Sequence, residues 1–502
     1  MDSSEAGSWL QTADWVIIFL YLSVVIGLGF HFGKGQNSTK DYFLGNRNIP
    51  WWGVSFSILA TETSALTFLG IPAVAYAGDL SFIQIIIGYV IARLILAVVM
   101  VPLYFKKEVY SPYQLFSDAF GISVRRLAGG FFLISGTLAA GVRVYITCIP
   151  IQLMLDLSIL SSIYLFVILS LVYTYIGGIK AVIWTDAMQF FILIFGGAFA
   201  LYFINGQMDE GLSGMIREGG RAGKLDWLSL DFSLTMPENG MPYNVWMGII
   251  GATFHVASSH GVDQLIVQRV LTCRTENDGR KALWLSAALI LPVMLLFLLV
   301  GTSLWYFYGQ HPLKIPLPET ENFTKNDYIF PIFILTEMPS GFKGVLIVGI
   351  LSAAMSSVSS ALSALASVSV MDFFKPFDRK QRGELFYFKL SRWTTLFWGG
   401  VLVLVAYLSR ELEFVLNAAF KLAGLTSGAM LGAMLLVLIY RKGSAAPVLM
   451  GMSASFLCMI GISIGASDQI AWPWFTMIGT VVCVLVSSFC RKLQSSQSEL
   501  DA

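Results

Sequence analysis

The sequence predicts an all-α protein that crosses a membrane many times, and three observations support this prediction. The chain has 502 residues, of which 56% are hydrophobic and only 13% are charged, against about 25% charged residues in an average soluble domain. Apolar stretches of about 20 residues, enough for a helix to span a bilayer, recur along the whole chain. Lys and Arg gather in alternate loops between these stretches. We therefore expect one transmembrane domain over residues 1–502, surrounded by the lipid bilayer.

Thirteen apolar stretches can be delimited as spans. If all thirteen cross the membrane, most of the 32 Lys and Arg fall on one side. Because basic loops stay in the cytoplasm, we expect a multi-pass plasma (inner) membrane protein with its N-terminus outside and its C-terminus in the cytoplasm. The spans lie near residues 15–33, 51–76, 80–104, 127–155, 158–177, 181–205, 243–268, 282–308, 342–371, 390–409, 413–440, 445–466 and 470–490.

The composition also excludes several classes of function. The net charge of +1 offers no electrostatic surface for nucleic acid, whose binding depends on neutralising phosphates with Lys and Arg. The four His residues are too few and too scattered for a haem or metal protein. No set of nucleophile and base and no cofactor motif is present, so we do not expect an enzyme.

Ionisable residues also fall inside predicted spans, among them Glu62, Arg93, Arg143, Asp186 and Lys421. Each costs at least a few kcal/mol in the membrane and is expected to face a cavity or a partner. Glu62 and Arg143 lie near mid-depth, too far from either interface to reach it easily. They either form buried ion pairs that only fix helix packing or line a transport path, and a pair of Glu62 with Arg143 would leave no charge for a ligand. The packing explanation suits Arg93 and Lys421 better.

The second and seventh spans are interrupted. The second, 51–76, contains a polar run and then Gly-Ile-Pro; the seventh, 243–268, contains Gly248, Gly251 and the run HVASSHG. These spans are five apart and therefore cross the bilayer in opposite directions. Such pairs indicate an inverted-repeat transporter with its site near the midplane, since unwound backbone is tolerated only where it lines a cavity. Ordinary Gly and Pro kinks with close helix packing are the alternative.

The ninth span carries the serine-rich run SAAMSSVSSALSAL at 352–365. In a helix Ala353, Ser356 and Ser357 share one face, and Ser356, Ser359 and Ser360 share another. Hydroxyls are hard oxygen ligands of the kind that suit hard cations such as sodium. A packing face of small residues explains the run equally well. The residues alone leave both explanations open.

Four longer stretches resemble the sodium:solute symporter family, in the same order and over nearly the whole chain. They are DYFLGNRNIPWW at 41–52, YTYIGGIKAVIWTDAMQ at 173–189, GVDQLIVQR at 261–269 and AAMSSVSSALSALASVSVMD at 353–372. The resemblance, which extends to bacterial sialic acid and sugar symporters, implies the leucine-transporter-like fold. This fold is a five-plus-five inverted repeat, here 51–205 and 243–440, with one extra helix in front and two behind. It also implies sodium-coupled import of a small polar solute by alternating access, and it sets no oligomeric state.

The resemblance also implies site residues. The family's common sodium site corresponds to Ala60, Thr63, Ala353, Ser356 and Ser357. A second sodium site, found in bacterial sialic acid symporters, corresponds to Asp186, Ser356, Ser359 and Ser360. Candidate contacts to the small-molecule substrate are Glu62, Ser64, Thr67, Gln84, Arg143, Ser258, Ser259 and His260.

Arg143 lies near the place where the sialic acid symporters bind a carboxylate, and Arg binds carboxylates through a two-pronged, directional pair. We therefore favour an acidic sugar or another organic acid as the solute. The run SSH at 258–260 replaces the aromatic gate of sugar-transporting relatives, which weakens a plain hexose interpretation. A neutral-sugar symporter and a proton-coupled carrier using Glu62 or Asp186 remain as alternatives. A channel is disfavoured because no filter-like loop such as TVGYG occurs.

Overall fold

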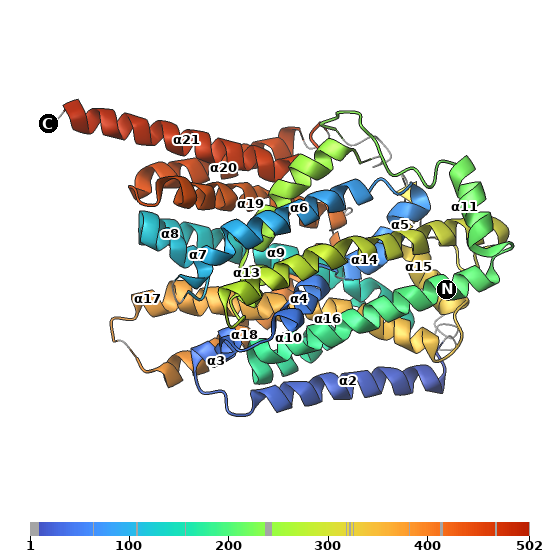
Figure 1. Ribbon diagram of the computed structural model, residues 1–502. Coiled ribbons are helices and arrows are strands. Elements are labelled where there is room, and N and C mark those ends of the chain that lie inside the picture. Colours follow the sequence, from blue (N-terminus) through green and yellow to red (C-terminus); the bar gives the residue numbers. More distant parts are fainter. Residues whose placement is uncertain are drawn as a thin grey trace.

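The protein is a bundle of helices whose long axes run in broadly similar directions (Figure 1). The computed structural model describes residues 10–63, 65–106, 109–155, 157–235, 243–317, 319–320, 323–324, 326–380, 382–411, 415–466 and 469–500. The elements of the first half are α2 (Thr12–Gly33), α3 (Thr39–Leu44), η1 (Gly45–Arg47), α4 (Trp51–Glu62), α5 (Ala65–Ala77), α6 (Ile83–Val99), α7 (Val101–Phe105), α8 (Tyr113–Phe120), α9 (Ile122–Leu155), α10 (Ile159–Gln207) and α11 (Gly211–Arg221).

The second half adds two two-residue strands to its helices. Its elements are η2 (Met247–Ala252), α12 (Thr253–Gly261), α13 (Gln264–Val270), α14 (Glu276–Gln310), β1 (Glu319–Thr320), β2 (Phe323–Thr324), η3 (Asn326–Tyr328), α15 (Ile329–Thr336), α16 (Phe342–Val368), η4 (Ser369–Phe374), α17 (Lys375–Phe377), α18 (Glu384–Leu408), η5 (Ser409–Glu411), α19 (Val415–Tyr440), α20 (Ala445–Gly465) and α21 (Pro473–Leu500).

The prediction of a polytopic all-helical membrane protein is confirmed. Within the described residues, nine helices are long and apolar enough to cross a membrane, and the bent pair α4–α5 makes ten. The shorter apolar helix Gly424–Tyr440 lies in α19. These helices account for most of the stretches that the sequence marks as spans.

Helix α10 folds back on itself at Gly178. Its 49 residues would extend about 70 Å as one straight helix, more than twice the thickness of the hydrocarbon core. Gly178 has a φ of 54°, a conformation that a side chain would disfavour. Gly33 packs against Ile176, whereas Tyr21 accepts a hydrogen bond from Gln189 (2.8 Å). The segment after Gly178 therefore runs back along α2.

Both predicted helix breaks are present. Helices α4 and α5 meet at an angle of 56°, because α4 ends at Glu62 within the polar run. Pro72 lies inside α5, so the expectation that Gly-Ile-Pro also interrupts this span is wrong. The seventh span is divided into η2, α12 and α13. The last break falls before Asp263, whose carboxylate accepts a hydrogen bond from the Leu265 N–H (2.8 Å) and caps α13.

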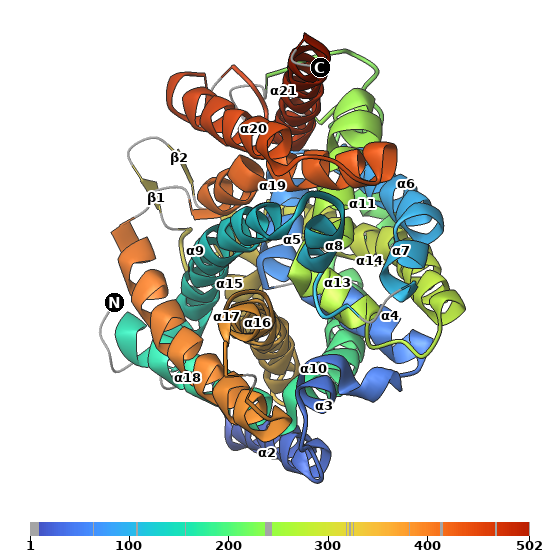
Figure 2. The ribbon, with the colours of Figure 1, turned by 90° about the vertical axis from the view of Figure 1, so that its left-hand side faces the viewer.

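Helix α16 lies near the centre of the bundle, with α9, α10 and α18 close by (Figure 2). All six serines between residues 352 and 363 are buried. The serine-rich run therefore faces protein on every side, and its hydroxyls need partners inside the bundle.

Candidate functional site

The break between α4 and α5 lies beside the serine-rich part of α16. Thr61 Oγ1 is 3.4 Å from Ser360 Oγ, and further along the Phe68 ring contacts Gly349. The bent pair thus runs antiparallel to α16, and Thr63, the residue at the break, comes between these two contacts.

Two buried hydroxyls of the first predicted sodium site lack hydrogen-bond partners among the described residues. They belong to Thr63 and Ser356. Ser357 donates to the Ala353 carbonyl (3.2 Å). Because α4 ends at Glu62, the Ala60 carbonyl is among the last four of the helix, which lack partners within it. The five residues of the first predicted sodium site are therefore all buried on the two facing segments, and they offer hard oxygen atoms.

The second predicted sodium site centres on Asp186, which is fully buried on α10. Asp186 Oδ2 accepts hydrogen bonds from Ser57 Oγ (2.6 Å) and Arg269 Nη2 (3.0 Å). Asp186 Oδ1 has no hydrogen-bond partner in the part of the chain that the structure describes. The Ser356 side chain lies beside this carboxylate, and Ser360 Oγ accepts a hydrogen bond from Arg269.

The position of Arg269 corrects the sequence analysis, in which the seventh span ends at residue 268, just before Arg269, and no partner is named for Asp186. Helix α13 continues after the break as far as Val270, and Arg269, in its last turn, is fully buried within the bundle. The ion pair of Arg269 and Asp186 joins the second half of the seventh span to the second half of α10.

Several serines of α16 accept hydrogen bonds from one face of α13. Gln264 Nε2 donates to Ser367 Oγ (3.2 Å), and Gln268 Nε2 donates to Ser363 Oγ (3.1 Å). For these serines the packing explanation holds. Ser359 Oγ, in contrast, donates to the carbonyl of Ser356 on its own helix (3.1 Å).

A second buried ion pair lies at the other face of the α4–α5 break. Glu62 pairs with Arg93 of α6, and Arg93 Nη2 is 3.2 Å from His260 Nε2 of α12. Ser259 Oγ is 3.0 Å from His260 Nδ1. This answers the open question of the Glu62 partner, which is Arg93 and not Arg143. The sequence showed Arg93 only as an intramembrane charge and did not place it in the site.

Arg143 of α9 is partly buried, and its guanidinium makes no hydrogen bond or ion pair with any described residue. Tyr89, His255 and Asp263 lie within electrostatic reach of it. Asp263 is already engaged as the cap of α13. Arg143 is thus an intramembrane cation without a hydrogen-bonded counter-charge among the described residues.

Two other candidate substrate contacts make hydrogen bonds within the protein. Thr67 Oγ1 donates to the Glu62 carbonyl across the helix break (3.1 Å). Ser258 Oγ donates to the Ser427 carbonyl of α19 (2.9 Å). Ser64 lies outside the described residues.

Gln84 is fully buried at the start of α6 and binds backbone. Its Nε2 donates to the Tyr243 carbonyl (2.7 Å), and its Oε1 accepts from the Ser229 N–H (3.0 Å). These bonds tie the segment before the seventh span to α6. The side chain of Lys421, the last intramembrane cation, lies outside the described side chains.

Two interrupted helices, buried oxygen atoms around a central helix and intramembrane charges together define a membrane transporter. The sodium:solute symporter family matches residues 42–455. The chain belongs to the sodium:solute symporter family, and it is a transporter and not an enzyme.

Relatives of known function cover almost the whole chain. The sodium/sialic acid symporter NanT of Aliivibrio fischeri is 29% identical over 95% of this chain and 92% of its own. The sodium/sialic acid symporter SiaT of Proteus mirabilis is 26% identical over 97% of this chain and 96% of its own. A solved Na+-coupled sialic acid symporter, in a substrate-bound outward-open state with a novel Na+ site, superposes with a TM-score of 0.86 at 25% identity, over 96% of this chain and 98% of the other.

Proposed function

We propose that this plasma-membrane symporter uses a sodium gradient to import a small acidic solute, with an acidic sugar of the sialic acid class as the first candidate. The observation that carries the proposal is Arg143, a partly buried guanidinium without a partner among the residues described. A solute carboxylate is the group that its planar fork binds best. The sialic acid symporters among the relatives support the same solute class.

The two alternative functions fit these charges less well. A neutral sugar would leave the Arg143 guanidinium without a hydrogen-bonded counter-charge in the membrane, because the Asp263 carboxylate lies within its electrostatic reach but forms no ion pair with it, and this is unfavourable. A proton-coupled carrier would need Glu62 or Asp186 to take up a proton. Each of these carboxylates is paired with a buried arginine, and protonation of the carboxylate would leave that arginine without its counter-charge, which is costly in a buried pair.

Two sodium sites follow from the buried oxygen atoms. The first would use Ala60, Thr63, Ala353, Ser356 and Ser357. The two hydroxyls of this set that have no hydrogen-bond partner in the described part of the chain support it. The second would use Oδ1 of Asp186, which Arg269 does not bind, together with Ser356, Ser359 and Ser360. Its support is weaker in one respect, since Arg269 already holds Oδ2 of the same carboxylate.

We infer from this contact that the Arg269 guanidinium and the second sodium ion bind Asp186 alternately. When no ion is bound, the guanidinium neutralises the Asp186 carboxylate and donates a hydrogen bond to the Ser360 hydroxyl. A sodium ion that binds Asp186 and Ser360 displaces the guanidinium from both. Binding of the ion would then release α13 from α10 and α16, which links sodium binding to movement of the broken helix.

The topology that we propose has thirteen spans. Helix α10 supplies two of them, and the divided segment 243–270 supplies one. The repeats are 51–205 and 243–440, the extra helix α2 precedes them, and α20 and α21 follow. The N-terminus would lie outside and the C-terminus in the cytoplasm, according to the distribution of Lys and Arg.

A thermal-shift screen with purified protein tests the solute class. Acidic sugars, organic acids and uncharged sugars are each added in sodium chloride and in choline chloride at one pH. A ligand that binds only the folded state stabilises it, so we expect acids to raise the unfolding temperature in sodium and not in choline. Stabilisation by uncharged sugars alone would contradict the proposal.

A further inference from the structure

Residues 226–235 form an irregular segment that runs past the beginnings of three membrane-spanning segments. The carbonyls of Asp226, Ser229 and Leu234 accept hydrogen bonds from backbone N–H groups near the start of α6, of the seventh span and of α21, at 3.0, 2.9 and 2.7 Å. The donors are Leu80, Val245 and Ala471, respectively. The segment lies at the periphery of the bundle, beside the start of α21 (Figures 1 and 2).

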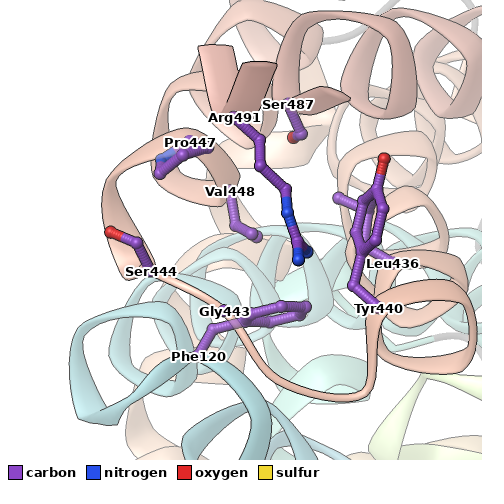
Figure 3. Close-up of a pocket in the computed structure, with 9 residues that line it drawn as sticks. All are labelled: Phe120, Leu436, Tyr440, Gly443, Ser444, Pro447, Val448, Ser487 and Arg491. Carbon is purple, nitrogen blue, oxygen red and sulfur yellow. The ribbon is translucent and has the colours of Figure 1, made fainter. Parts of the chain in front are cut away.

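The direction of α21 shows on which side of the membrane this segment lies. Near the far end of the helix, Arg491 stacks over the Tyr440 ring at 4.0 Å (Figure 3). That end of the bundle also carries Arg441 and Lys442, so we assign it to the cytoplasm. Helix α21 begins at Pro473, about 27 Å from Arg491 along the helix, which is close to the thickness of the hydrocarbon core. The segment at the beginning of α21 therefore lies at the outer surface of the membrane.

The segment exposes a row of apolar side chains. They are Leu228, Leu230, Phe232 and Leu234, at 49%, 66%, 63% and 47%. Residues two apart in an extended chain point to the same side, and the serines that alternate with this row, Ser229 and Ser233, are half-buried. Between residues 227 and 235 the only charged residue is Asp231. In water this row would be an unfavourable apolar patch.

The backbone of the segment is bonded to the protein and not left to water. Besides the three carbonyls at the span ends, the Ser229 N–H donates to Gln84 Oε1 (3.0 Å), and the Leu230 carbonyl accepts from Trp246 Nε1 (3.0 Å). Irregular backbone beside lipid needs its polar groups satisfied within the protein. The segment meets this requirement at several positions while its apolar side chains point outward.

The surface next to the row favours lipid as its partner. Trp246 and Ile249, one turn apart at the start of the seventh span, are each 41% exposed, and the Phe232 ring lies 5.8 Å from that of Trp474 in the first turn of α21. A Trp with its N–H bonded and its ring exposed is typical of the aromatic belt at the membrane surface. The row thus continues the apolar surface of the spans themselves.

We propose that residues 227–234 lie in the interface of the outer leaflet, with the four apolar side chains of the row among the lipid acyl chains. Apolar side chains that bind in this way are buried about 5–10 Å into the boundary between head groups and acyl chains. The contact with lipid depends neither on the proposed solute nor on the sodium sites. Only its assignment to the outer leaflet rests on the proposed topology.

The test attaches a fluorescent label to single cysteines of the full-length protein in liposomes. The background is Cys458→Ser/Cys490→Ser, which removes the two native cysteines that are not buried. The label is placed at Leu230→Cys, at Ile464→Cys near the outer end of α20 (82% exposed) as the lipid control, and at Arg221→Cys (71% exposed) as the water control. We expect lipids with a nitroxide on the acyl chain to quench the Leu230→Cys label as strongly as the Ile464→Cys label, and iodide in the buffer to quench mainly the Arg221→Cys label.

Two patterns of quenching would contradict the proposal. If iodide quenches the Leu230→Cys label as strongly as the Arg221→Cys label, the segment lies in water. If neither quencher reaches it, protein covers the row, as in an association of two copies of the chain. If Leu230→Cys does not reconstitute, photo-crosslinking from benzoylphenylalanine in place of Phe232 replaces the comparison. Adducts with lipid then support the proposal, and adducts with a second copy, or the absence of lipid adducts, refute it.

Discussion

Replacement of Arg143 by glutamine should weaken binding of an acidic solute while leaving the protein folded. Loss of one partner of a buried charge pair costs about 2–5 kcal/mol. Arg143 is only partly buried, so the lower part of this range, about 2–3 kcal/mol, applies, and this is about 30- to 150-fold in affinity. The guanidinium forms no ion pair with a carboxylate among the described residues, so Arg143→Gln breaks no ion pair, and the nearby Asp263 carboxylate keeps its hydrogen bond to the Leu265 N–H.

The assay is equilibrium binding to purified protein in saturating sodium, with sialic acid and its methyl ester. In wild type the acid should bind more tightly than the ester. In Arg143→Gln the acid should lose the predicted factor while the ester binds as before, so that the difference isolates the carboxylate contact. Arg221→Gln is the matched control, since that side chain is 71% exposed in a loop helix.

Two outcomes would refute this reasoning. If acid and ester weaken equally in Arg143→Gln, the arginine shapes the site and does not bind the carboxylate. If the acid binds to the variant within about threefold of wild type, less than 1 kcal/mol, the solute charge is bound elsewhere.

Three further predictions concern sodium and the buried ion pairs. Ser356→Ala should raise the sodium concentration for half-maximal uptake, because its hydroxyl is one of the two in the first site that have no hydrogen-bond partner among the described residues. Asp186→Ala should lower the sodium Hill coefficient of uptake from above one toward one, because the second site loses its carboxylate. Arg269→Gln should destabilise the sodium-free protein by about 3–5 kcal/mol, the cost of stranding a buried charge. Added sodium should restore much of that stability, because the ion binds the Asp186 carboxylate in place of the guanidinium. Thermal unfolding with and without sodium measures both effects.

Each of these predictions has a control within the chain. Ser363→Ala removes a hydroxyl that accepts a hydrogen bond from Gln268 and belongs to neither sodium site. Uptake by this variant should therefore depend on sodium as in wild type. An equal change in Ser356→Ala and Ser363→Ala would contradict the first site. A Hill coefficient of one in wild type would contradict the second site. Arg93→Gln should leave Glu62 without its ion-pair partner and destabilise the protein, and added sodium should not restore the lost stability. Rescue of Arg93→Gln to the same extent as Arg269→Gln would contradict the exchange at Asp186.

The features that the sequence predicted well are local. The break after α4 follows from a polar run inside an apolar stretch, and the serines of α16 are visible as a cluster. Their burial follows from the apolar residues on every side of them. Such features need only a few neighbouring residues, and the structure places them as expected.

The features that the sequence did not predict depend on contacts between distant segments. Glu62 and Arg93 are 31 positions apart on different helices, and no local pattern distinguishes Arg93 from Arg143 as the partner. Arg269 lies at the apparent end of a hydrophobic stretch, where charged residues normally mark a loop. The backbone break at Asp263 redirects α13 and buries Arg269, and hydropathy does not register this change of direction.

Gln84 shows the same limit for candidate substrate contacts. A polar residue within a span is a reasonable candidate for solute binding. Its amide instead satisfies two backbone groups of the segment before η2, which are far away in the sequence. Only the tertiary structure shows which buried polar residues already have partners.

Uptake into proteoliposomes tests the central claim most directly. The purified protein is reconstituted, and uptake of radiolabelled sialic acid is measured at fixed pH with an inward gradient of sodium chloride or choline chloride. We predict accumulation above the external concentration in sodium and none in choline. Accumulation in choline driven by a proton gradient, or equal uptake of the acid in both salts, would contradict sodium-coupled symport of an acidic solute.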